Sequence, residues 1–320
     1  MAELALGIDL GGTKIAGALV TREGTVVAEV RTPTRPEEGV EPVIGRMAEC
    51  IRALQAQAGS GHRIVGIGIG AAGSTDHVRG VVIMGSNLRW VNVPLRDRLL
   101  AHLGDAWAGP ISVAKDTNAA ALGELLYGAG RGAQTILYVT VGTGIGGGLV
   151  LEGKLYHGVS GGAADLGHLI VETDGPLCGC GKRGCVEALA SGPAIARQAR
   201  EQLAAGRPSI LADRPPETLT AVDVVEAAQR GDALAREIIT LAGQRLGMVL
   251  AWCVDVVNPE RIIIGGGVAA AGDLLFEPVR QTVAVRALPS NVEAVRIVPA
   301  GLGANSGEIG AAALVWAGAA

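Results

Sequence analysis

The feature that most constrains the fold of this chain is a pattern that occurs twice. An apolar strand, a turn rich in glycine and threonine, and a second apolar strand occupy residues 4–21, and the same succession returns at residues 136–152. Each copy is followed by alternating predicted helices and strands, which is typical of α/β layers. The repetition predicts two similar α/β halves that face each other, the first of which opens with a meander of three strands.

The length of the chain agrees with two halves, because 320 residues exceed the usual size of one domain. We expect a small lobe of residues 1–118, completed by a C-terminal helix at 305–320, and a large lobe of residues 119–304. In the first half, strands are predicted at 4–9, 14–21, 25–33, 63–70 and 111–116, with a helix within 39–59. In the second half, helices are predicted near 192–206, 220–230 and 232–257, and strands at 261–267 and 295–300.

Composition argues against a membrane protein and against a nucleic-acid-binding protein. The chain is 49% hydrophobic, but no apolar run reaches the ~18 residues that span a bilayer. Its first ten residues lack a basic start and include Asp9 where a signal peptide would stay apolar. With a net charge of −4 and no Lys/Arg tract, a broad basic face is not expected. We therefore expect a soluble, cytoplasmic protein with neither a membrane nor a nucleic acid as partner.

The stretch IDLGGTKI, residues 8–15, is suited to binding phosphate. A strand that ends in Asp-x-Gly-Gly-Thr and turns back sharply presents backbone N–H groups, a hydroxyl and a lysine to phosphate oxygens, with the aspartate placed for Mg²⁺. An ordinary glycine hairpin can have the same residues, so this stretch alone decides nothing. The candidate nucleotide-binding residues here are Asp9, Gly11, Gly12, Thr13 and Lys14.

Two further glycine turns strengthen the case for a nucleotide. They lie in VTVGTGIGGG, residues 139–148, and IIIGGGV, residues 262–268, and glycines let a phosphate or a flat ring approach the backbone. Their candidate residues are Thr143, Gly144, Gly265, Gly266 and Gly267. With three such turns the chain resembles the superfamily of sugar kinases, actin and Hsp70 ATPases. The resemblance implies a two-lobed, actin-like (ribonuclease H-like) α/β fold, phosphate loops at 9–14 and 142–146, and an adenosine-side turn at 265–267.

A candidate catalytic base lies in VAKDTNAAALGE, where a strand gives way to a helix. The carboxylate of Asp116 could remove a proton from a hydroxyl that attacks the γ-phosphate of ATP. An isolated Asp-x-Asn is more often a helix N-cap. Both interpretations can hold, with Asp116 as the base and Thr117 or Asn118 as the cap.

Three of the five cysteines of the chain fall within eight residues. Together with a preceding histidine they form H-x9-C-x-C-x4-C, a set compact enough for one tetrahedral Zn²⁺: His168, Cys178, Cys180 and Cys185. A disulfide is disfavoured in a cytosolic chain, and plain buried thiols would not need the glycines between these cysteines. Four protein ligands leave no open position, so we expect a structural metal.

The same segment carries a resemblance to one family. The stretches DLGH, CGCGKRGCVEALAS, IDLGGTKIAG, VGTGIGGG and IIIGGGV resemble the ROK family of bacterial sugar kinases, glucokinases above all, over residues 6 to about 315. The resemblance implies that Asp116 is the base and that His168 binds zinc with one ring nitrogen while its other edge faces the sugar. It implies a dimer or tetramer. The candidate substrate-binding residues are Gly73, Asn87, Lys115, Asn118, Asp165, His168 and Glu187.

Two residues depart from the family pattern. Lys115 stands where the family usually has Asn, and Asp165 stands where it usually has Glu. Both positions normally contact the sugar ring, so either the substrate differs from glucose or the family tolerates the change.

The resemblance implies an ATP- and Mg²⁺-dependent hexokinase that acts on the 6-hydroxyl of glucose. Kinases of fructose, mannose, N-acetylglucosamine or N-acetylmannosamine remain open, as do polyphosphate as donor and a non-catalytic sugar-binding regulator. A repressor of the family would carry a helix-turn-helix ahead of the first phosphate loop, which here begins at residue 7, so we do not expect one.

Overall fold

The structure is a computed structural model that describes residues 2–318. These residues form two compact units. The first consists of the residues up to 134, residues 148–163 and the residues from 300 onward. The second consists of residues 135–147 and 164–299. The lobe boundaries expected from the sequence, at 118 and 305, stay a prediction.

A five-stranded sheet of order β3-β2-β1-β4-β8 forms the centre of the first unit. Its strands are β1 (Ala2–Leu10), β2 (Lys14–Thr21), β3 (Val26–Pro33), β4 (His62–Ala71) and β8 (Ile111–Lys115). Strands β1, β2 and β3 pair antiparallel as the predicted meander, and β4 lies parallel to both β1 and β8. The carboxyl ends of β1, β4 and β8 therefore meet at one edge of the sheet.

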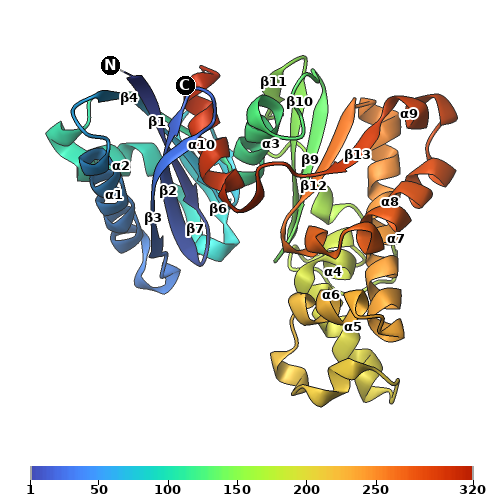
Figure 1. Cartoon of the computed structure of the whole chain (residues 1–320). Coiled ribbons are helices and arrows are strands. Elements are labelled where there is room, and N and C mark those ends of the chain that lie inside the picture. The colour runs from blue at the N-terminus through green and yellow to red at the C-terminus, as the bar shows by residue number, and fades with distance from the viewer. Residues whose placement is uncertain (1, 319–320) are drawn as a thin grey trace. The chain divides into compact units, whose positions relative to one another are not determined.

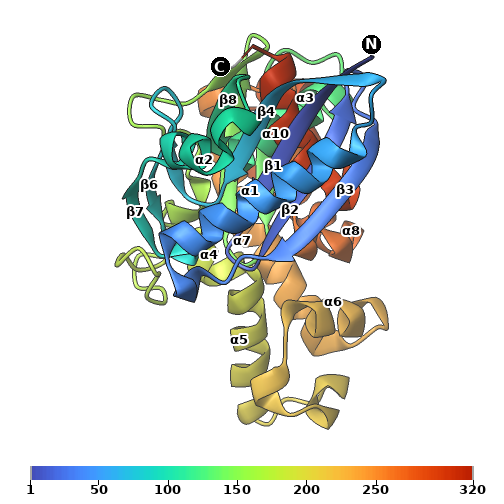
Figure 2. The same ribbon diagram turned by 90° about the vertical axis from the view of Figure 1, so that its left-hand side faces the viewer.

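Helices cover both faces of this sheet, α1 (Val40–Gln57) on one side and α10 (Ser306–Trp316) on the other (Figure 1). Alternate residues of β1, including Leu6 and Ile8, belong to the same apolar core as the buried face of α1. Figure 2 shows α1 lying across the strands of this face. The opposite face carries small residues. A side chain on Gly7 would run into the backbone carbonyl of Glu308, so α10 rests directly on the strand backbones.

Three short strands add a small antiparallel sheet to the first unit. They are β5 (Ser74–Asp76), β6 (Val81–Gly85) and β7 (Trp90–Val93), in that order. Trp90 is 2% exposed and packs in the core. The helices α2 (Leu95–Leu103) and α3 (Asp116–Tyr127) flank strand β8 in the sequence.

The second five-stranded sheet has the order β11-β10-β9-β12-β13, which repeats the order of the first. Its strands are β9 (Ile136–Val141), β10 (Ile145–Leu151), β11 (Lys154–Tyr156), β12 (Arg261–Gly265) and β13 (Arg296–Pro299). Strands β10 and β11 pair antiparallel, and β12 is parallel to β9 and β13. The duplicated α/β topology predicted from the sequence is thus confirmed.

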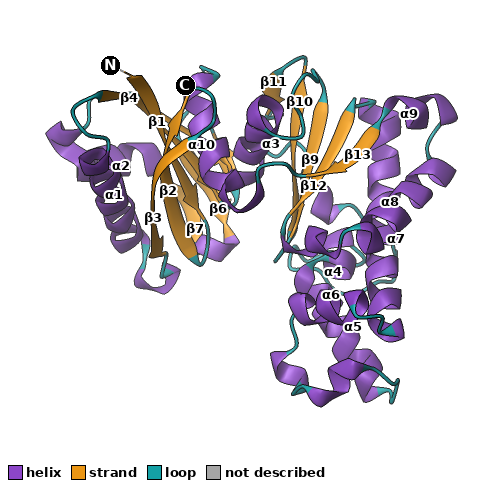
Figure 3. Cartoon of the chain, viewed as in Figure 1, coloured by secondary structure: helices purple, strands orange, loops and turns teal. Residues whose placement is uncertain are grey.

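The second unit is rich in helices (Figure 3): α4 (Val186–Ala190), α5 (Gly192–Ala204), α6 (Ala221–Gln229), α7 (Ala233–Val257), α8 (Asp273–Arg286) and α9 (Pro289–Ala294). Helix α6 starts at a capping box of Thr220 and Asp223. Helix α7 is long and apolar enough to cross a membrane, but 61% of its most apolar window is buried and it packs on α8. Such burial is typical of the core helix of a globular domain.

Candidate functional site

The first predicted phosphate turn joins β1 to β2. The backbone N–H of Gly11 donates to the carbonyl of Lys14 (3.0 Å), and the hydroxyl of Thr34 donates to the carbonyl of Gly11 (2.7 Å). A side chain at Gly12 would lie 2.7 Å from Cβ of Asn87, so the structure brings these two predicted residues into contact. Thr13 and Lys14 are exposed at the tip of the turn.

Asp9 and Asp116 lie at the ends of β1 and β8, the two strands on either side of β4 in the first sheet. Asp9 pairs in register with Gly70 of β4, and the backbone of Asp116 packs against Gly70, which has no side chain to separate them. Burial, together with the charges of Asp116 and Glu308, raises the pKa of Asp9 to about 7, while the charge of Lys14 opposes this shift. The structure therefore gathers carboxylates at this edge, where a cation would be stabilised.

The first turn of α3 corrects one sequence-based expectation. Asp116 opens the helix and its Oδ1 accepts a hydrogen bond from the backbone N–H of Thr117 (2.7 Å), while Lys115 occupies the N-cap position. Thr117 and Asn118 lie inside the helix, so the prediction that either of them is the N-cap was wrong. Lys115, Thr117 and Asn118 are all buried.

Asn118 is the most deeply buried of these residues, at 1% exposure. Its Nδ2 lies 3.3 Å from Nδ1 of His157, and the His157 ring stacks on His77 with centroids 3.7 Å apart. Its Oδ1 has no hydrogen-bond partner among the residues that the structure describes. This histidine pair was not predicted from the sequence, because nothing in the order of residues brings positions 77 and 157 together.

Gly73 lies between the large and the small sheet of the first unit. Its φ of 119° is a conformation that favours glycine, and its Cα packs against the backbone of β6. Asn87 follows in the short turn between β6 and β7. Gly73 and Asn87 therefore belong to the same unit as Asp9 and Asp116.

The two glycine turns of the second unit lie at adjacent strand ends. Gly265 of β12 pairs in register with Thr140 of β9. Gly266 has a φ of 86° and packs against the backbone of Val141, directly before the turn at 142–146. The structure thus brings the predicted phosphate loop and the predicted adenosine-side turn together.

Glu187 connects the turn at 142–146 with the cysteine-rich segment. It lies in the first turn of α4, and its Oε2 accepts a hydrogen bond from the backbone N–H of Ile145 (2.9 Å). A hollow of about 350 Å³ beside it is lined by Thr143, Cys178 and Ser191, among others. Asp165 directly precedes a short 3-10 turn, Leu166–His168, of which His168 is the last residue, and Asp165 is exposed.

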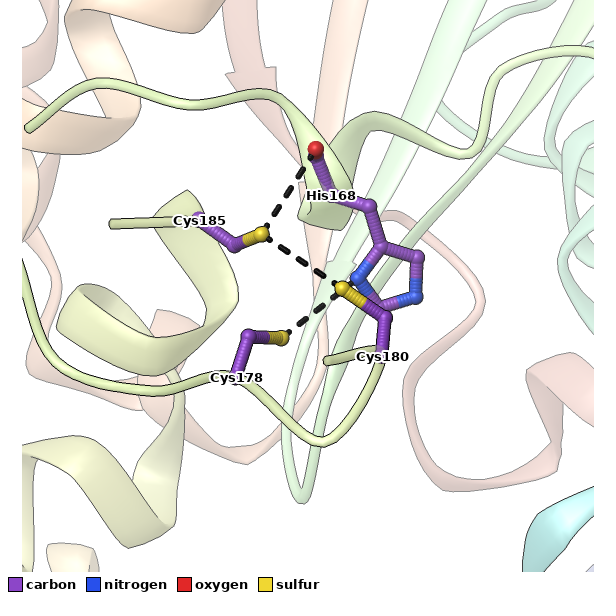
Figure 4. Close-up of side chains that lie close together, drawn as sticks. All are labelled: His168, Cys178, Cys180 and Cys185. Carbon is purple, nitrogen blue, oxygen red and sulfur yellow. Dashed lines mark hydrogen bonds between the residues drawn. The ribbon is translucent and has the colours of Figure 1, made fainter. Parts of the chain in front are cut away.

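The four predicted zinc ligands converge on one point (Figure 4). Their ligand atoms lie within 4.8 Å of one another. Sγ of Cys180 is 3.6 Å from Sγ of Cys185, and Sγ of Cys178 is 3.7 Å from Nδ1 of His168. Ligand atoms about 2.3 Å from a tetrahedral Zn²⁺ would be separated by just under 4 Å, so the donor set fits this ion.

Burial raises the pKa of the Cys178 thiol and raises that of Cys185 to about 12, whereas a backbone hydrogen bond from Lys182 lowers the pKa of the Cys180 thiol. All three would bind Zn²⁺ as thiolates, a form that the positive charge of the ion would itself stabilise. The other two cysteines, Cys50 in α1 and Cys253 in α7, are buried and do not belong to this cluster.

The structure also shows one potential site residue that sequence reasoning missed. Glu308, in the first turn of α10, is buried and adds its charge to the surroundings of Asp9. The only sequence signal was an acidic residue in an otherwise apolar helix, and such a residue usually faces solvent.

Two sheets of one topology, with an aspartate at a strand end of one and paired glycine turns on the other, define the actin-like class of ATPases and sugar kinases. The family model described as ROK family matches residues 5–317. The chain therefore belongs to the ROK family.

Close relatives include both enzymes and regulators. A glucokinase of Thermotoga maritima is 39% identical, with 97% of this chain and 96% of that protein covered. The crystal structure of a ROK family glucokinase from Streptomyces griseus in complex with glucose and AMPPNP superposes with a TM-score of 0.84 at 34% identity, covering 97% of this chain and 98% of that one. A ROK family transcriptional regulator, a homologue of the Escherichia coli Mlc protein, has a TM-score of 0.88 at 27% identity, covering 99% of this chain and 78% of the regulator.

Proposed function

We propose that this protein is an ATP-dependent hexokinase that phosphorylates the 6-hydroxyl of glucose. The observation that carries the proposal is the likeness to glucokinases along nearly the whole length of both chains. The two carboxylates that flank Gly70 agree with it, since phosphoryl transfer to an alcohol needs a base and a cation site.

Asp116 is proposed as the general base. Its carboxylate lies at the N-terminus of α3, where the helix dipole and the N–H of Thr117 stabilise a negative charge. There it would accept the proton of the 6-hydroxyl as that oxygen attacks the γ-phosphate. Because phosphoryl transfer has a loose transition state, the base contributes about 10²–10⁴-fold and positioning supplies most of the rest.

Nucleotide binding is assigned to the glycine turns. Asp9 is proposed to hold Mg²⁺, which neutralises phosphate charge when it is bound. The backbone N–H groups and side chains that would bind ATP belong to Gly11, Gly12, Thr13, Lys14, Thr143, Gly144, Gly265, Gly266 and Gly267.

The residues that contact the sugar are proposed from the family resemblance. Among them, Glu187 is the one whose position is best fixed by contacts in the structure. Ile145 fixes one of its carboxylate oxygens, and Cys178 lies 3.8 Å from the other. His168 turns Nδ1 toward the cysteines, which leaves its Nε2 edge for a hydroxyl (Figure 4). Zinc would keep these two side chains in fixed positions. The remaining proposed contacts are Gly73, Asn87, Lys115, Asn118 and Asp165.

Several finer points belong to the proposal as well. The enzyme would act in the cytoplasm as a homodimer or homotetramer and would contain one structural Zn²⁺ in each chain. The proposed lobes comprise residues 1–118 with 305–320, and residues 119–304. Another sugar is the main alternative, because Lys115 and Asp165 depart from the family pattern. A non-catalytic sugar-binding regulator is the second, favoured by the likeness to a transcriptional regulator.

Release of ADP in the presence of Mg²⁺ and a panel of sugars tests the proposal. We expect the highest kcat/KM with glucose, ahead of mannose, fructose, N-acetylglucosamine and N-acetylmannosamine. When polyphosphate replaces ATP no ADP is formed, so glucose 6-phosphate is measured instead, and we expect it to form more slowly than with ATP. A preference for another sugar would replace glucose in the proposal. Absence of ADP release with every sugar would favour the regulator.

A further inference from the structure

One row of residues crosses the first sheet beneath the start of α10. Asp9 of β1 pairs with Ala16 of β2, and Ala16 pairs with Arg31 of β3. The first turn of α10 covers this row: a Cβ on Gly307 would lie 2.7 Å from the carboxyl carbon of Asp9. Ala16, between Asp9 and Arg31, contributes only a methyl group to this row, and Oε1 of Glu308 lies 3.7 Å from Nη2 of Arg31.

Glu308 is buried without hydrogen-bond partners. It is 1% exposed, and neither of its carboxylate oxygens has a hydrogen-bond partner among residues 2–318. Nη2 of Arg31 is 3.7 Å from Oε1, beyond hydrogen-bond distance, and donates to Oδ1 of Asn305 at 2.9 Å. An acidic side chain in this condition is costly unless a cation balances it.

A second buried glutamate of the same unit shows the contrast. Glu124 of α3 is 0% exposed, but its carboxylate accepts hydrogen bonds from the backbone N–H groups of Ala129 (2.7 Å), Gly301 (2.9 Å) and Leu302 (3.0 Å). Glu124 therefore holds a loop in place. Nothing comparable holds the carboxylate of Glu308, so a structural role explains Glu124 better than it explains Glu308.

On the side of Glu308 that lies toward Asp9, the neighbouring charged groups are mainly negative. Asp9 interacts electrostatically with Asp116 and with Glu308, and Lys14 is the one positive charge that acts on Asp9 among the described residues. A divalent cation with oxygen ligands would relieve the repulsion between these carboxylates. Mg²⁺ keeps several of its waters when it binds to proteins, so it can link carboxylates that do not touch.

We propose that Glu308 is a metal-positioning residue: it accepts a hydrogen bond from a water of the divalent cation that Asp9 binds. The inference deepens the proposed function and rests on it for the identity of the cation as the Mg²⁺ of Mg·ATP. The alternative is that Glu308 serves only as a counter-ion for Arg31.

Direct binding of Mn²⁺ to the zinc-containing protein, without sugar or nucleotide, tests the inference. Free Mn²⁺ is measured by electron paramagnetic resonance for the wild type, Glu308→Gln and the matched control Glu124→Gln. We expect Glu308→Gln to weaken Mn²⁺ binding at least tenfold and Glu124→Gln to leave it within twofold of the wild type. Circular dichroism establishes that each variant is folded.

Thermal unfolding provides a second readout that does not depend on activity. In metal-free buffer, Glu308→Gln should unfold at the same or a higher temperature than the wild type, because it removes a buried carboxylate charge that no hydrogen bond stabilises. Added Mg²⁺ should raise the unfolding temperature of the wild type more than that of the variant. If Glu308→Gln instead unfolds at a lower temperature and binds Mn²⁺ like the wild type, Glu308 is the counter-ion of Arg31 and the inference is wrong.

Arg31→Gln separates the two roles if Glu308→Gln does not fold. By the inference, loss of this positive charge leaves Mn²⁺ binding unchanged or stronger; weaker binding would overturn it. The failure of the proposed function looks different. If no sugar supports ADP release while Mn²⁺ binding still depends on Glu308, the result supports the cation site and contradicts the proposed kinase activity.

Discussion

Oε2 of Glu187 accepts a hydrogen bond of 2.9 Å from the backbone N–H of Ile145. Glu187 follows Cys185 by two residues, and Ile145, which lies within the turn at 142–146, is the first residue of strand β10. This bond ties a proposed sugar ligand, next to the cysteine cluster, to a proposed phosphate loop. A substitution that displaces either segment should therefore also displace the other.

Gly144→Ala should damage sugar use through this contact. A Cβ at Gly144 would lie 2.6 Å from Oε2 of Glu187 and would displace the carboxylate. We expect kcat/KM for glucose to fall by roughly 10²-fold, the cost of misplacing a positioning group by about 1 Å. Steady-state kinetics with glucose as the varied substrate measures the effect.

Gly142→Ala is the matched control, because a Cβ there meets no atom within 4 Å. Its kcat/KM for glucose should stay within a few fold of the wild type. Equal losses in the two variants would mean that the turn responds to any added methyl group and that displacement of Glu187 is not the cause.

Zinc should be present at one ion per chain and should matter for the sugar more than for the nucleotide. Cys180→Ser removes one of four ligands, and we expect zinc affinity and glucose affinity each to fall about 10–100-fold. Metal analysis and calorimetric titration with glucose and with ATP check this. The control variant Cys253→Ser, in α7, should retain its zinc. A wild-type zinc content in Cys180→Ser would show that the cysteine cluster is not the zinc site.

The pH dependence of stability should report on His157. Burial, and secondarily His77, lower the pKa of His157 from 6.5 to about 4. Between these two values the unfolded chain binds a proton that the folded chain excludes, so stability falls as pH drops from about 6.5 toward 4.

His157→Gln should remove this contribution while keeping a side-chain partner for Asn118. We expect the loss of unfolding free energy between pH 7 and pH 5 to be about 1 kcal/mol smaller in the variant, after allowance for partial solvent screening. Urea unfolding at the two pH values measures it. The same loss in both proteins would show that His157 titrates normally.

The sequence was most informative where local pattern and tertiary structure agree. Strands β1 and β2 are largely buried along their length and are joined by a glycine turn, so the start of the meander was predictable. The repeat of that pattern at 136–152 predicted the repeated strand order. The spacing of His168 and the three cysteines predicted that these side chains converge.

Features that depend on packing between distant segments were not predictable. The small sheet β5-β6-β7 escaped detection because exposed apolar residues such as Met84 and Val91 obscure its alternation. Thr117 and Asn118 have the chemistry of helix caps, but the helix already begins at Asp116, so Lys115 occupies the N-cap position. The burial of Glu308 follows from small residues on strands far away in the sequence.

The turnover of Asp116→Asn tests the central claim most directly. The substitution keeps the shape of the side chain and removes the base, so the account predicts a kcat for glucose phosphorylation at least about 10²-fold below the wild type, with glucose affinity nearly unchanged and the fold intact. A folded Asp116→Asn protein that phosphorylates glucose at close to the wild-type rate would contradict it.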